Sequence, residues 1–323
     1  MNNKTRQYIR QYKWSNIFAM VRNNLRDSKL CRDDCQGRLV VITGATSGIG
    51  YAAARKYASR GAKLLCVNRN LAKSQRLQKE IQNEFGTECE FLIADLSKLS
   101  DIHRVADELA RLETPINVLI HNAGVYLTRR EITSDGLEKV WVVHYLASFI
   151  INYRLMDKLR AQDRARIIMV GSEGHRFAAW GLRLDDLNWE KRRYSGLGSY
   201  GSAKLAQLLA MIYFNEQFRN SGVSINTMHP GAVKTETGQE NGALYRWFKK
   251  HCFDRTLKSP LVSAEALYYL GVSKEVDGVS GKFFNLSTME DPAPPAMDRD
   301  VAGQLWEITL AMSGLLNNPE QEI

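Results

Sequence analysis

Short apolar runs alternate with longer helical stretches along most of the chain after Arg38. Stretches with apolar residues at helical spacing include Ile49–Ser59, Leu71–Phe85, Ser100–Leu112, Leu137–Leu159 and Ser199–Phe218. The runs with the length and composition of buried strands are Leu39–Thr43, Lys63–Val67, Cys89–Ala94, Asn117–Ile120, Arg166–Val170, Ser224–Met228 and Lys282–Asn285. This alternation predicts an α/β fold, a doubly wound parallel sheet with right-handed crossovers and helices on both faces.

Residues 1–36 differ from the rest, because they are rich in Lys, Arg and Asn and carry no strand-like run. Their apolar residues recur at roughly helical spacing: Tyr8, Ile9, Tyr12, Ile17, Phe18, Val21 and Leu25. Such a basic amphipathic helix either packs on the following domain or lies on an anionic membrane surface. We therefore expect an N-terminal extension of residues 1–36, a single α/β domain of residues 37–316 and a tail of residues 317–323.

Composition narrows the class of protein. The chain has 323 residues and a net charge of +9, which suits an anionic partner or a basic surface without one. Its five cysteines form no CxxC pair, and no apolar segment approaches the length of a membrane span. We expect a reduced, cytoplasmic protein, at most peripheral to a membrane, and no nucleic-acid module is recognisable. His103 and His251 lack metal-ligand spacing, so we expect no metal.

A glycine-rich turn follows the first strand directly. It reads Gly44, Ala45, Thr46, Ser47, Gly48, Ile49, Gly50 and leads into a helix. Glycines allow a tight turn and a close approach of the backbone to a pyrophosphate at the positive end of that helix. The spacing Gly-x3-Gly-x-Gly is not the usual GxGxxG fingerprint, but its place after the first strand predicts a dinucleotide site.

The end of the second strand indicates which dinucleotide. It carries Asn68 and Arg69 and no acidic residue. An acidic side chain would accept bonds from the ribose hydroxyls, whereas a guanidinium pairs with a 2′-phosphate. The sequence therefore favours NADP(H). Asp95, followed by Leu96, comes after the third strand and could bond the adenine amino group. Asn122, Ala123 and Gly124 follow the fourth strand and would support the sheet and border the ribose.

A possible proton-transfer site lies at Tyr200–Lys204, with Ser172 upstream. Residues four apart share one face of a helix, so the Tyr200 phenol and the Lys204 ammonium can meet. An ammonium favours the phenolate and lowers the pKa of a tyrosine from its usual value near 10. Such a tyrosine could exchange a proton with an alcohol or carbonyl oxygen.

These motifs together resemble the short-chain dehydrogenase/reductase family over roughly residues 37–316. The resemblance implies a seven-stranded Rossmann sheet that binds a nicotinamide cofactor. The stretches Arg130–Glu138, Asp186–Asn188 and Gly303–Glu307 are similar to the retinol dehydrogenase and WW-domain oxidoreductase branch. That branch commonly prefers NADP(H), in agreement with Arg69.

The resemblance also implies roles for individual residues. Tyr200 would be the general acid/base, Lys204 would lower its pKa and bond the nicotinamide ribose, and Ser172 would hold the substrate oxygen. In addition, Pro230, Gly231 and Val233 would line the nicotinamide, and Thr235 would bond its phosphate. The reaction would interconvert a carbonyl and an alcohol on a hydrophobic small molecule.

One position departs from the family pattern. The family's catalytic tetrad includes an asparagine, thought to hold a water that relays protons to the lysine. Here His144 occupies that place, 172 − 144 = 28 residues before Ser172. Three alternatives follow: a working relay through His144, a slower enzyme, or a fold that binds cofactor without turnover. The last would make the protein a cofactor-binding scaffold or sensor.

Two further expectations concern the surface. Residues 236–262 correspond to the family's substrate lid, where Tyr245, Trp247 and Phe248 could contact a hydrophobic ligand or simply pack. Homo-oligomers are common in the family, through the helices that here carry His144 and Tyr200. The N-terminal extension could alter that assembly.

Overall fold

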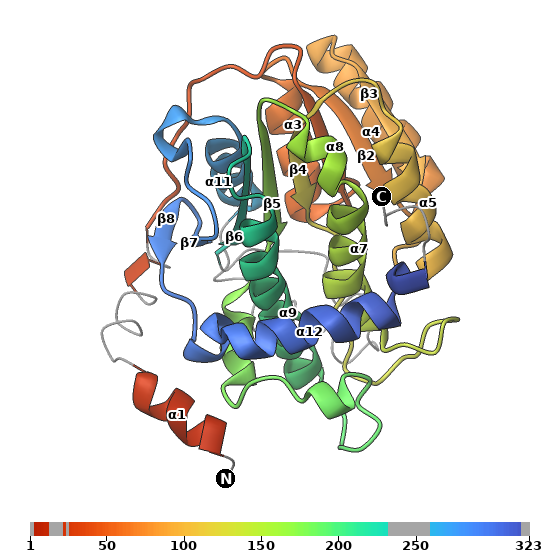
Figure 1. Cartoon of the computed structure of the whole chain (residues 1–323). Coiled ribbons are helices and arrows are strands. Elements are labelled where there is room, and N and C mark those ends of the chain that lie inside the picture. Colours follow the sequence, from red (N-terminus) through yellow and green to blue (C-terminus); the bar gives the residue numbers. More distant parts are fainter. Residues whose placement is uncertain (1–2, 13–21, 24–25, 232–258, 318–323) are drawn as a thin grey trace.

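Eight strands form one sheet in the part of the chain that the computed structural model describes, residues 3–12, 22–23, 26–231 and 259–317. Their spatial order is β3-β2-β1-β4-β5-β6-β7-β8 (Figure 1). The strands are β1 Leu39–Thr43, β2 Lys63–Asn68, β3 Cys89–Ile93, β4 Ile116–His121, β5 Ala165–Val170, β6 Val223–His229, β7 Phe283–Asn285 and β8 Thr288–Glu290. The order reverses between β1 and β4, and such a switch point forms a crevice at the carboxyl ends of the strands.

The predicted doubly wound fold is confirmed, but the predicted strand count is one short. The seven predicted strands are present and pair in parallel. β8 is an additional antiparallel strand, joined to β7 by a tight turn at Leu286 with φ of 53°. Three residues are too short for an alternating pattern to be recognised, so the sequence did not indicate it.

Helices cover both faces of the sheet because both faces are apolar. Along β1, Val40 and Ile42 pack beneath α3, α4 and α11, whereas Leu39 and Val41 face α5, α7 and α9. The α-helices are α1 Asn3–Gln11, α3 Gly48–Ala58, α4 Leu71–Phe85, α5 Leu99–Ala110, α6 Lys139–Trp141, α7 Ala147–Arg154, α8 Met156–Arg160, α9 Gly196–Gln217, α11 Pro260–Val272 and α12 Arg299–Met312. The predicted helix Leu137–Leu159 is interrupted, because Val142–Leu146 forms a π-helical turn.

Helix α12 crosses α9 and α7 on the outer side of the molecule (Figure 1). Its Trp306 packs on Phe149 of α7 and Phe214 of α9, with ring centroids 4.8 and 4.9 Å away. These are the helices through which homo-oligomerisation was predicted. In the single chain, α12 thus covers part of this face.

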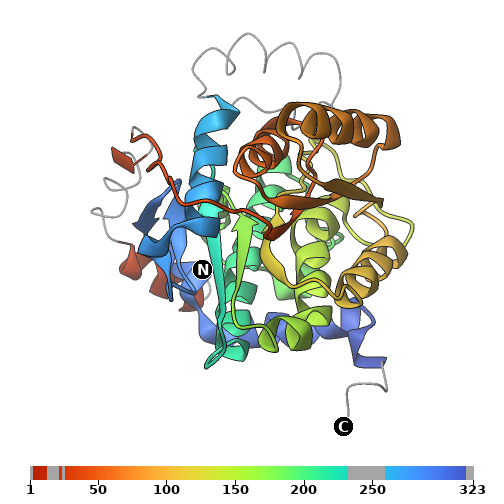
Figure 2. The ribbon, with the colours of Figure 1, turned by 90° about the horizontal axis from the view of Figure 1, so that it is seen from above.

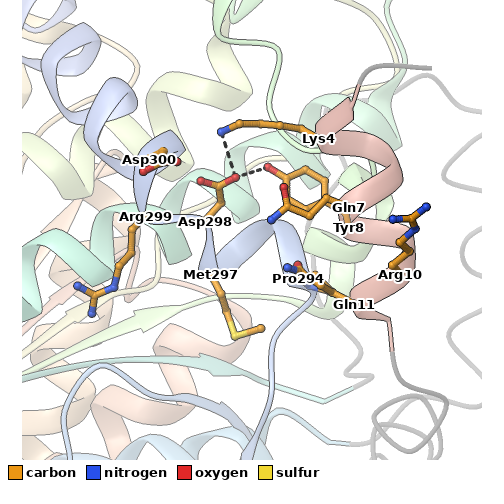
Figure 3. A pocket seen from close by; sticks show the side chains of 10 residues that line it. All are labelled: Lys4, Gln7, Tyr8, Arg10, Gln11, Pro294, Met297, Asp298, Arg299 and Asp300. Carbon is orange, nitrogen blue, oxygen red and sulfur yellow. Dashed lines mark hydrogen bonds and ion pairs between the residues drawn. The ribbon is translucent and has the colours of Figure 1, made fainter.

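The described part of the N-terminal extension packs on the α/β domain. Figure 2 shows the segment before β1 running beside α11. There the Lys29 amide donates to the Ser287 hydroxyl at 2.8 Å, and the Tyr268 hydroxyl donates to the Asp33 carbonyl at 2.5 Å. In α1, Tyr8 is buried and donates to the Asp298 carboxylate at 2.6 Å (Figure 3). Of the predicted apolar stripe, Ile17, Phe18, Val21 and Leu25 lie outside the described residues.

Tyr8 should hold α1 in place. A Cβ on Gly181 would lie only 2.9 Å from Cε2 of the Tyr8 ring. Helix α1 and the backbone at Gly181 therefore meet closely. Changing Tyr8→Ala removes this packing and the bond to Asp298, which we expect to destabilise α1 docking by about 2–3 kcal/mol. Hydrogen exchange of the α1 amides should accelerate by about 30-fold or more. The neighbouring Ile9→Ala is the control, because Ile9 is 45% exposed; equal exchange in both variants would contradict the docking role.

Candidate active site

The glycine-rich turn after β1 leaves the first turn of α3 open. Gly44 and Gly48 have φ of 72° and 54°, a backbone region that favours glycine. A Cβ on Gly50 would lie 2.1 Å from the Gly44 carbonyl oxygen, so no other residue fits there without a backbone shift. Ser47 precedes the helix but its side chain makes no capping bond. The helix N-terminus is thus suited to an anion such as phosphate.

The loop after β4 braces this turn. The Asn122 side-chain amide donates to the carbonyls of Thr43 and Gly44, at 3.1 and 2.9 Å. In return the Thr43 hydroxyl accepts from the amides of Asn122 and Ala123, at 3.0 and 3.1 Å. The two adjacent strand ends are therefore locked together where the switch point lies.

The end of β2 supplies polar groups beside the turn. Asn68 accepts from the Ala45 amide at 2.8 Å, while its buried Nδ2 has no partner among the described residues. Arg69 is exposed next to it. Burial raises the pKa of the Asp95 carboxyl, but bonds from the Ser97 hydroxyl and amide together with the charge of Arg69 outweigh this and lower it. The open N-terminus of α3, the buried Asn68 amide and the Arg69 guanidinium together suit a phosphorylated dinucleotide.

The other predicted cofactor residues lie around the same strand ends. Pro230 and Gly231 follow β6, where the Pro230 carbonyl accepts from the Ser263 hydroxyl at 2.6 Å. Val233 and Thr235 lie outside the described residues. The remaining ones sit on the turn, on α3 or after β3: Thr46, Ser47 and Asp95 are half-buried, and Ile49 and Leu96 are buried.

Ser172 and Tyr200 meet beyond the end of β5. Ser172 begins the 3₁₀ turn Glu173–Ala178, where its hydroxyl accepts from the Gly174 amide at 2.9 Å. Burial raises the pKa of the Tyr200 phenol, and its hydrogen bond with the Ser172 hydroxyl opposes the rise. A Cβ on Gly174 would lie 2.6 Å from the Tyr200 ring, so this glycine makes room for the phenol.

Lys204 lies below Tyr200 in the protein interior. Its Nζ donates to the Val170 carbonyl at 2.6 Å and to Gln207 Oε1 at 3.0 Å, and stands 5.7 Å from the centroid of the Tyr200 ring. Burial lowers the pKa of Lys204 to about 7. The sequence predicted a lowered tyrosine pKa, but here it is raised, because burial of the phenol dominates and the lysine is itself desolvated.

The His144 side chain bonds to backbone rather than to Lys204. Its Nε2 lies 2.7 Å from the Val125 carbonyl oxygen and 3.1 Å from the Val125 amide. A Cβ on Gly124 would come within 2.3 Å of the imidazole, so glycine is required beside it. Burial and the charge of Lys204 hold the pKa of His144 well below its usual value, and the ring is neutral. This geometry ties the ring to the loop after β4.

The remaining active-site histidines are structural and neutral. His175 is fully buried: Nδ1 donates to the Ser172 carbonyl at 2.7 Å and Nε2 accepts from the Ala293 amide at 3.0 Å. Burial lowers the pKa of His175 and of His229 to about 3. It lowers the pKa of His121, which bonds Asn152, to about 4.

Known proteins share this arrangement. A family model described as short chain dehydrogenase matches residues 38–181. Retinol dehydrogenase 13 of Homo sapiens is 34% identical over 284 residues, covering 86% of this chain and 85% of that protein. The chain belongs to the short-chain dehydrogenase/reductase family. The predicted resemblance to that family is thereby confirmed.

The branch resemblance is supported as well. WW domain-containing oxidoreductase of Danio rerio is 29% identical over 297 residues, covering 89% of this chain and 71% of that protein. Among solved structures, an uncharacterized protein from Mycobacterium paratuberculosis superposes with a TM-score of 0.69 at 26% identity, covering 87% of this chain and 95% of that one. This short-chain dehydrogenase is thus similar to retinol dehydrogenases and to WW-domain oxidoreductases.

Sequence reasoning missed two residues of the site of this short-chain dehydrogenase. Gln207 contacts Lys204, and its position three residues later on the same helix could have indicated this. Tyr126 packs edge-on against Tyr200 with centroids 5.9 Å apart, which no motif signals.

Two features are absent from the described residues. They contain no group of three or more His, Cys, Asp or Glu side chains arranged to hold a metal ion. Nor does any described helix have the length and apolar character needed to cross a bilayer.

Proposed function

We propose that this short-chain dehydrogenase is an NADP(H)-dependent oxidoreductase that interconverts a carbonyl and an alcohol on a hydrophobic small molecule. The observation that carries the proposal is the cluster of half-buried Ser172 and Tyr200 with buried Lys204 at the carboxyl end of β5. This cluster and the glycine-rich turn after β1 lie at the same edge of the sheet, because β1, β4 and β5 are parallel.

Each residue of the cluster has a distinct task. The Ser172 hydroxyl, fixed by the Gly174 amide, holds the substrate oxygen. Tyr200 gives a proton to that oxygen during reduction and takes it back during oxidation. When charged, Lys204 would oppose the rise that burial causes in the pKa of Tyr200, and it would position the nicotinamide ribose. A bound nicotinamide cofactor supplies or accepts the hydride.

Support for NADP(H) over NAD(H) comes from the end of β2. Asn68 and Arg69 stand there in place of an acidic residue, and a guanidinium pairs well with a 2′-phosphate. Arg69→Ala should weaken NADPH binding by roughly 10- to 100-fold and leave NADH binding unchanged. Fluorescence titration with both cofactors measures this. Arg76→Ala, on α4 and paired with Glu80, is the control; an equal loss for both cofactors would contradict the role of Arg69.

The rival proposal, a scaffold or sensor with little turnover, keeps one observation in its favour, the histidine at the tetrad position. A panel of hydrophobic aldehydes, ketones and quinones, including all-trans-retinal, separates the two when mixed with NADPH. We expect nicotinamide absorbance to fall with at least one compound. Tight NADPH binding with no consumption across the panel would favour the scaffold.

We place the protein in the cytoplasm, at most peripheral to a membrane. Supporting this, the four described cysteines, Cys31, Cys35, Cys66 and Cys89, are buried free thiols, which suit a reducing compartment. The predicted lid of residues 236–262 falls outside the described residues except for its last four positions.

A further inference from the structure

A side-chain amide links Lys204 to the helix that carries the tetrad position. Gln207 accepts from Lys204 Nζ through Oε1 at 3.0 Å. Its Nε2 donates to the backbone carbonyl of His144 at 2.7 Å. All three residues are buried. The connection from the lysine to residue 144 therefore runs through one glutamine side chain and ends on a backbone carbonyl.

The His144 carbonyl lies within an irregular turn of the backbone. Residues Val142–Leu146 form a π-helical turn, in which the Ala147 amide bonds the Val142 carbonyl five residues back. Such turns disturb the regular bonding of an α-helix and often occur at functional sites. Beside the amide of Gln207, the His144 carbonyl receives only a longer bond of 3.4 Å from the Ser148 hydroxyl among the described side chains.

The charge state of the side chains around Lys204 decides which groups can stabilise its ammonium, and Gln207 is one of these groups. Three titratable side chains face it: Tyr200 on its own helix, His144 on the π-helical turn and His229 at the end of β6. Both histidines are neutral, because burial holds their pKa values far below neutrality. The oxygens of Val170 and Gln207 are thus the groups that stabilise the buried ammonium.

We propose that Gln207 is a positioning residue for Lys204. The side-chain amide of Gln207 stands between the Lys204 ammonium and the His144 carbonyl and fixes both. Two of the three N–H donors of Lys204 are directed by Val170 and Gln207, which sets the direction of the third. The proposal concerns the geometry of Lys204. That this geometry matters for turnover rests on the proposed function. It differs from a relay through the imidazole, because the His144 ring bonds Val125 instead.

Titration of Lys204 by NMR tests this in the cofactor-free protein. With ¹³Cε-labelled lysine, the Lys204 signal is assigned by its loss in Lys204→Arg, and its midpoint is followed with pH. Gln207→Met keeps the volume but removes the acceptor, so the midpoint should fall by about one pKa unit. Gln207→Glu places a carboxylate there and should raise it by about one unit or more.

Ser148→Ala is the matched control, because Ser148 bonds the same carbonyl without touching Lys204; its midpoint should equal that of the wild type. Opposite shifts in the two Gln207 variants support the proposal. Unmoved midpoints, or shifts in the same direction, overturn it. The titration needs no turnover, so an inactive wild-type protein would count against the proposed function alone.

Discussion

Replacing Tyr200 with phenylalanine should lower kcat by about 10²- to 10⁴-fold and leave the Kd for NADPH unchanged. The substitution removes only the phenolic hydroxyl, the group that we propose to exchange a proton with the substrate oxygen. Since the ring remains, its packing beside Gly174 and against the His144 ring, 5.2 Å between centroids, should persist. Steady-state kinetics and fluorescence titration of NADPH measure the two quantities.

Tyr126→Phe is the matched control for this change. Tyr126 is a second half-buried tyrosine whose ring packs edge-on against Tyr200. Losing its hydroxyl should alter kcat far less than the loss at Tyr200. If Tyr200→Phe kept full activity, or if both variants lost activity equally, Tyr200 would not be the proton donor.

Substituting Gly50 by alanine should weaken NADPH binding by roughly 10- to 100-fold. A Cβ at this position would stand 2.1 Å from the Gly44 carbonyl oxygen and 2.4 Å from Asn122 Nδ2. Because the first neighbour is backbone, the turn itself must shift, and the bonds from Asn122 that brace it must lengthen. We expect a lower Tm together with the weaker binding.

Tyr51→Ala separates binding from general loss of stability. Tyr51 is the next residue on α3, but its hydroxyl donates to Glu80 at 2.8 Å, away from the turn. This larger truncation should lower the Tm and retain NADPH affinity. Full NADPH affinity in Gly50→Ala would show that the turn does not hold the cofactor.

Periodicity predicted most of the fold because both faces of the sheet are covered. Runs such as Leu39–Thr43 are buried throughout and apolar up to Thr43, as expected of a parallel strand between two helical layers. β8 escaped prediction because it has three residues and depends on a turn at Leu286. The crossing of α12 over α9 depends on how Trp306 packs, which no local pattern contains.

The site was predictable to the extent that its residues lie in motifs. The glycine-rich turn, Ser172, Tyr200 and Lys204 occupy neighbouring strand ends because the sheet is parallel. The π-helical turn at His144 and the Gln207 amide depend on tertiary contacts between two helices. The raised pKa of Tyr200 follows from its depth of burial, which sequence spacing does not reveal.

The most direct test of the proposed chemistry follows the hydride itself. The protein is incubated with NADPH in which both hydrogens at C4 of the nicotinamide are replaced by deuterium and with a hydrophobic aldehyde from the panel, and the product is analysed by mass spectrometry. We expect an alcohol carrying one deuterium on the former carbonyl carbon, formed by the wild type and at least about 100-fold more slowly by Tyr200→Phe. No alcohol from any compound of the panel, or an alcohol without deuterium, would contradict the account.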